Sequence, residues 1–79
     1  MTRSQITKAV KLIRTAEALR TEALWSERSF ATLHLTDALR RQQHDAENAF
    51  VRLMRPIYES LTAAEGMALS TRLHRLAGV

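Results

Sequence analysis

Neither glycine nor proline occurs in residues 1–55, MTRSQITKAVKLIRTAEALRTEALWSERSFATLHLTDALRRQQHDAENAFVRLMR. Proline breaks a helix because its ring clashes with the preceding turn and it lacks an N–H donor, and glycine costs backbone entropy. The run is also rich in Ala, Leu, Arg and Glu, which favour helix. No alternating, β-branched stretch indicates a strand. The sequence therefore predicts an all-α protein.

Two capping boxes predict where helices begin. In such a box, the side chains of the N-cap residue and of the residue three positions later each bond the other's backbone N–H. Thr2 and Gln5 fit this pattern at the start of an amphipathic stretch, and Thr62 and Glu65 fit it near the C-terminus. We therefore expect one helix to begin just after Thr2 and a final helix to begin just after Thr62.

The C-terminal helix is expected to run to about Ala77, with Gly78 as its stop, because glycine is common just past a helix end. Pro56 is expected to end or kink the helix before it, since the residue before a proline disfavours helical geometry. Pro56 also suits the first position of a new helix. These signals predict a helix boundary close to Pro56.

The sequence leaves open whether residues 5–54 form one helix or contain a turn near Ser26. Ser26 and Ser29 are typical N-cap residues, but the glycine usually found at a helix C-terminus is missing. One continuous helix would be roughly 75 Å long at 1.5 Å per residue, too long for the rest of the chain to cover. Two architectures follow, a long helical hairpin or a three-helix arrangement.

An apolar stripe marks the middle of the chain if that part is helical throughout. Its members follow one another at helical spacing: Leu19, Ala23, Phe30 and Leu33. We expect this stripe to complete a helical bundle through a homodimer or a higher oligomer. Trp25 falls on the more polar side of such a helix, where an exposed Trp is a binding anchor. A turn at Ser26 would instead bury it.

The length of the chain, 79 residues, predicts a single helical domain covering residues 1–79. A chain this short buries only about 60% of its unfolded surface. It has no cysteine, so oligomerisation replaces disulfides as the expected source of extra stability. The absence of cysteine also fits a cytoplasmic location. No apolar run is long enough to predict a transmembrane segment.

The sequence predicts no catalytic residue, no cofactor and no metal site. His34 and His44 each have a carboxylate three residues later, Asp37 and Glu47. Such a pair supplies two ligands where zinc needs three or four. No Gly-x-Ser-x-Gly elbow and no glycine-rich phosphate loop occurs. We therefore expect that the protein is not an enzyme.

The net charge of +4 comes from the N-terminus. Four cations precede the first acid: Arg3, Lys8, Lys11 and Arg14. They are candidate contacts for an anionic surface, or they form an ordinary solvated helix face. Arg72 and Arg75 would face DNA if residues 60–66 were the turn of a helix-turn-helix. These six residues are the candidate anion contacts.

These features favour a non-catalytic helical module, an adaptor, chaperone or regulator, that associates with itself and with another protein. The apolar stripe would supply the affinity, and Arg and Glu around it would set the register. The alternative is a small DNA-binding regulator whose Arg and Lys contact phosphates. Binding through phosphates weakens steeply with salt, whereas an apolar contact persists.

Overall fold

The computed structural model describes residues 1–79 and contains three α-helices and one short 3-10 helix. α1 spans Arg3–Ser26, η1 spans Leu33–Leu35, α2 spans Thr36–Glu59 and α3 spans Ala63–Ala77. The chain is 84% helical and has no strand. The expected all-α fold is confirmed.

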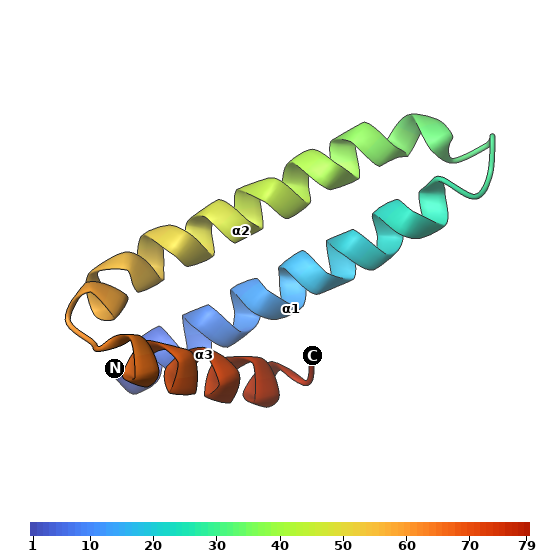
Figure 1. Ribbon diagram of the computed structural model, residues 1–79. Helices are drawn as coiled ribbons and strands as arrows, with labels where there is room; N and C mark the ends of the chain where they lie inside the picture. Colours follow the sequence, from blue (N-terminus) through green and yellow to red (C-terminus); the bar gives the residue numbers. More distant parts are fainter.

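α1 and α2 form a long antiparallel hairpin, and α3 crosses one end of it obliquely (Figure 1). We call that end the base; it also holds the N-terminus and the α2–α3 connection (Figure 1). The opposite end, where α1 turns back into α2, is the tip. The molecule measures 46 × 22 × 21 Å, so it is an elongated rod whose tip stands well away from α3.

Both predicted capping boxes are formed. The hydroxyl of Thr2 accepts from the Gln5 N–H at 3.1 Å, and the Gln5 side chain accepts from the Thr2 N–H at 2.9 Å. The corresponding distances for Thr62 and Glu65 are 3.2 Å and 3.1 Å. α3 also ends as expected, because Gly78 adopts a left-handed conformation with φ of 79°.

Pro56 does not end the helix, so the prediction of a helix boundary there is wrong. α2 continues through it to Glu59. A proline inside a helix removes the hydrogen bond to the carbonyl four residues earlier, here that of Arg52. Both Arg52 and Pro56 are exposed, so water can bond the freed carbonyl and the cost of continuing the helix is reduced.

The core is concentrated at the base of the hairpin. Met54 of α2 and Leu73 of α3 are its largest fully buried side chains. They form a cluster with smaller buried residues of α1 and α3: Ala9, Ile13 and Ala77. α3 is therefore held against the hairpin by contacts that are distant in the sequence.

The half of the hairpin nearer the tip has a much thinner core. Only four residues are buried there, and all are small: Ala23, Ser26, Thr36 and Ala46. Small side chains allow α1 and α2 to approach closely, but they bury little apolar area. Several large apolar side chains of this half are exposed, and they are described below.

We predict that Thr62→Ala lowers the free energy of unfolding by roughly 1 kcal/mol, because α3 loses its N-cap. Thr71→Ala is the matched control, since Thr71 is exposed on the same helix and its hydroxyl makes no hydrogen bond within the chain. Urea denaturation of both variants tests this. Equal midpoints for Thr62→Ala and Thr71→Ala would contradict the assigned start of α3.

The same cap predicts a dependence on pH. The backbone N–H of Thr62 and then its hydroxyl hold the pKa of Glu65 below its ordinary value of 4.5. A carboxyl with a lowered folded-state pKa stabilises the fold above its unfolded pKa and loses that effect as pH falls. Between about pH 5 and pH 3, the wild type should lose more stability than Glu65→Gln, which keeps the bond without the charge. An equal loss of unfolding free energy with pH in the wild type and in Glu65→Gln would contradict the role of the Glu65 charge in the cap.

Candidate interaction surface at the hairpin tip

Three hydroxyl side chains close the tip. Ser26, the last residue of α1, is buried and donates from Oγ to the carbonyl of Ala23 at 2.8 Å. Its Oγ lies 2.5 Å from the hydroxyl of Thr36, the first residue of α2. Because the Ser26 proton is used on Ala23, Thr36 is the donor in this pair. Thr32 adds a bond from its hydroxyl to the Ser26 carbonyl at 3.0 Å.

Charged side chains add a second layer to the turn. Glu27, just after α1, forms an ion pair with Arg40 of α2, so the ends of the two helices are linked on the surface. The guanidinium of Arg28 lies over the ring of Trp25, 4.7 Å from its centroid. Both interactions are solvent-exposed and contribute little stability. They do restrict the conformations of Trp25 and of the loop that follows it.

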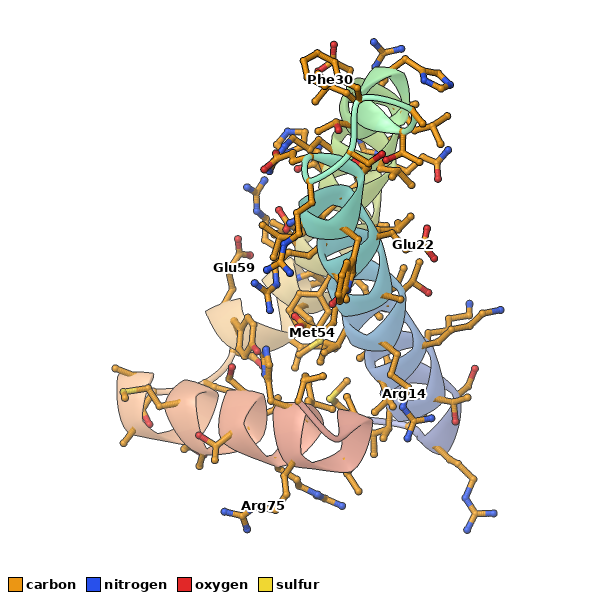
Figure 2. All side chains as sticks on the ribbon, turned by 90° about the vertical axis from the view of Figure 1, so that its right-hand side faces the viewer. Arg14, Glu22, Phe30, Met54, Glu59 and Arg75 are labelled. Atoms are coloured by element: carbon orange, nitrogen blue, oxygen red, sulfur yellow. The ribbon has the colours of Figure 1, made fainter.

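Large apolar side chains are exposed around this polar turn. Phe30 is 96% exposed and Trp25 is 63% exposed, and Figure 2 shows Phe30 at the end of the hairpin. Three leucines of the same segment are nearly half exposed. We define the tip patch as Leu24, Trp25, Phe30, Leu33 and Leu35. All five come from twelve consecutive residues of one chain reversal.

The tip patch is large for a chain of this size. Aromatic side chains carry about 150–250 Å² each, so Trp25 and Phe30 together expose on the order of 300 Å². With the leucines added, the patch reaches the range that marks interaction sites on single chains. Burying Phe30 alone would contribute roughly 2 kcal/mol. The chain itself offers nothing to cover it.

The continuous apolar stripe expected along one helix is not formed. Leu19 is half-buried on α1, and Ala23 is fully buried between α1 and α2, where no partner can reach it while the hairpin is closed. Phe30 and Leu33 lie beyond the end of α1, because the chain leaves the helix at Ser26. Of the two alternatives for residues 5–54, the turn near Ser26 is correct.

Trp25 is exposed, so the turn at Ser26 does not bury it. Two members of the tip patch, Leu24 and Leu35, were not among the predicted contact residues. Leu24 lies two residues before the turn residue Ser26 and Leu35 directly before Thr36, and these positions carry the signal. It becomes readable only after the turn is recognised.

The six candidate anion contacts do not act as one group. Arg3, Lys8 and Lys11 are exposed on α1. Arg14 is engaged inside the chain, because its Nε donates to the carbonyl of Ala77 at 3.2 Å and its Nη2 to that of Leu76 at 3.1 Å. A cation at the C-terminus of α3 also interacts favourably with the helix dipole. Arg14 therefore caps α3.

The two arginines of α3 are free of such contacts. Arg72 and Arg75 are exposed and form no ion pair or hydrogen bond within the chain. Figure 2 shows Arg75 pointing away from the hairpin. Arg72 lies beside a groove at the base.

The histidines are dispersed and no group of three metal-ligating side chains comes together. His34 lies in η1 and His44 on α2, both exposed. His74 on α3 bonds through Nδ1 to the Ser70 carbonyl at 2.8 Å, and its ring packs edge-on against Phe50. None of the helices has the length and apolar character needed to cross a membrane.

We predict that Thr36→Val lowers the free energy of unfolding by about 1 kcal/mol, since the buried hydroxyl pair with Ser26 is lost. Thr15→Val is the control, because Thr15 is exposed on α1 and its hydroxyl has no partner within the chain. Urea unfolding followed by emission of Trp25, the only tryptophan, gives the comparison. Identical stability of the two variants would contradict the role of the hydroxyls in closing the tip.

Comparison with known proteins identifies no relative, because no protein family, no curated protein and no solved structure matches this chain. Any functional assignment must therefore come from the chain's own residues and geometry. Among its surfaces, the tip patch combines the largest exposed apolar side chains with a turn held by hydrogen bonds.

Proposed function

We propose that this protein is a non-catalytic helical interaction module, an adaptor, chaperone or regulator, that works as a homo-oligomer and contacts other protein through its tip patch. The observation that supports this most strongly is that Phe30 is 96% exposed and Trp25 63% exposed in the same chain reversal. Aromatic side chains are enriched at the energetic centres of protein interfaces. A solitary chain would leave this area in water.

The construction of the tip also suits binding. The turn is fixed by the hydroxyls of Ser26, Thr32 and Thr36, so little conformational entropy remains to be lost when a partner docks. Charged side chains surround the patch, among them Arg28 and the Glu27–Arg40 pair. An apolar centre with a polar rim is the usual anatomy of a protein interface.

A cytoplasmic setting is part of the proposal. Its support is compositional, because the chain contains no cysteine that an oxidising compartment would pair.

The second candidate is nucleic-acid binding through α3. Its support is that Arg72 and Arg75 are exposed, without partners, on a helix that follows α2 after only three residues, Ser60–Thr62. A gel shift with random duplex DNA at low and high salt separates the two candidates. A salt-sensitive shift that Arg72→Ala and Arg75→Ala remove, and Phe30→Asp does not, would favour DNA over protein.

The main proposal predicts that the wild type self-associates and that Phe30→Asp weakens this association by about tenfold or more, because a charge replaces a central aromatic contact. Met67→Asp is the matched control, since Met67 is 73% exposed on α3, outside the tip. Sedimentation velocity over a concentration series gives the dissociation constants. Trp25 emission should move to shorter wavelength as the wild type associates. The association should persist at high salt.

Two outcomes would contradict the proposal. One is a wild type that keeps the mass of a single chain and a constant Trp25 emission at every concentration. The other is an association that Phe30→Asp and Met67→Asp affect equally.

A further inference from the structure

The largest cavity of the molecule is an open groove at the base, at the opposite end from the tip. It has a volume of about 680 Å³ and lies where α1, α2 and α3 meet. Most of its lining is apolar. Its lining includes Ile57, Ala68, Leu69 and Arg72.

The polar groups around this groove are mostly occupied. Gln5 and Glu65 use their side-chain oxygens in the two capping boxes, and the Ser60 hydroxyl donates to the Ile57 carbonyl at 2.8 Å. Arg72 is the exception, because its guanidinium has no ion pair and no hydrogen bond within the chain. The groove therefore offers an apolar floor and the unpaired guanidinium of Arg72.

The tip offers the complementary set. Phe30 projects from it as an aromatic side chain that the chain leaves uncovered. Of the two acids near it, Glu27 is paired with Arg40, whereas Asp37 in the first turn of α2 is exposed and has no ion pair. The tip therefore presents an apolar projection and one free anion.

We propose that the base groove receives the tip of a second copy of this chain, with Phe30 inserted against Ile57 and Leu69 and with Asp37 beside Arg72. This inference rests on the proposed function and names the partner surface. The unpaired carboxylate of Asp37 and the unpaired guanidinium of Arg72 are opposite in charge. A groove of this volume also has room for a phenyl ring and a neighbouring side chain.

The positions of the two sites determine the mode of assembly. Tip and groove lie at opposite ends of a molecule 46 Å long, so one chain cannot satisfy its own groove (Figure 1). Two copies lying antiparallel would each place their tip at the other's groove, whereas copies joined end to end leave one tip and one groove free. The contact therefore gives a closed antiparallel dimer or an open head-to-tail chain, and in both cases the average mass rises with concentration.

The test uses two variants, each blocked at one end. Phe30→Asp blocks the tip and leaves the groove intact. Ala68→Glu blocks the groove and leaves the tip intact; Ala68 is exposed, so the fold should tolerate the change, and the new carboxylate lies four residues before Arg72. Met67→Asp is the control, because Met67 neighbours Ala68 but does not line the groove.

Each blocked variant alone should associate about tenfold or more weakly than the wild type, and Met67→Asp should associate like the wild type. An equimolar mixture of Phe30→Asp and Ala68→Glu should form dimers and nothing larger, since one intact tip meets one intact groove. Analytical ultracentrifugation measures all four samples, and circular dichroism verifies that each variant keeps its helices.

Reversing the charges of Asp37 and Arg72 gives an independent test of the contact. Asp37→Arg and Arg72→Asp should each weaken association, because each places like charges at the contact. The chain that carries both changes should recover most of the lost affinity, since opposite charges meet again between copies. No recovery would overturn the assigned pairing of Asp37 with Arg72.

The outcomes separate this inference from the proposed function. If Phe30→Asp prevents association and Ala68→Glu does not, the tip is still the contact surface but the groove is not its partner. A mixture that stays monomeric also overturns the contact between tip and groove. If binding of a small apolar anion fills the groove and leaves self-association unchanged, the occupant is that ligand and this inference is wrong.

Discussion

The chain reversal between Ser26 and Thr36 is the constraint on which the rest of the structure depends. It pairs α1 with α2 and brings their small side chains together, so Ala23 is buried although it lies in a predicted surface stripe. The reversal is held by hydroxyl groups and needs no residue with positive φ; only Gly78 has one. Without it, α1 and α2 would be one rod and the tip would not exist.

The reversal also separates two tasks along the hairpin. At the base, Met54 and Leu73 are fully buried and tie α3 to the other helices. Toward the tip, the buried residues are small and the side chains of the tip patch face outward. Phe30 and Trp25 therefore contribute little to the stability of their own chain. A surface that the fold does not need for its own stability is free to serve association.

The polar residues divide in a similar way. Arg14 belongs to the fold, because it bonds the last carbonyls of α3. Arg40 and Glu27 belong to the turn. Asp37 and Arg72 have no such internal partner, and they lie at opposite ends of the rod. Charges that the fold leaves unpaired are the ones available to orient a second molecule.

The helix starts were readable from the sequence because a capping box is a local pattern. Thr2 with Gln5 and Thr62 with Glu65 satisfy each other within one turn, whatever the rest of the chain does. The tip was harder to predict, because its closure depends on Ser26 and Thr36, ten residues apart, whose contact is visible only after the fold is known.

The predicted helix boundary at Pro56 was wrong because it also rested on a local pattern. Local preference disfavours helix before a proline, but an exposed helix can tolerate the loss of one hydrogen bond. Of the candidate site, Phe30 and Leu33 were predicted as contact residues, whereas the exposure of Trp25 was left open; all three are exposed. The sequence pattern could not show that Ala23 is buried within the chain, since helical spacing does not say which side of a helix faces its own chain.

Hydroxyl-radical footprinting of the wild type, at concentrations below and above the dissociation constant of its self-association, tests most directly whether the tip patch is a contact surface. Trp25, Phe30 and Leu33 should become protected as the concentration rises, while Met67, exposed on α3, keeps a constant rate of modification. Unchanged modification of all four side chains, in a sample whose mass has increased, would contradict the account.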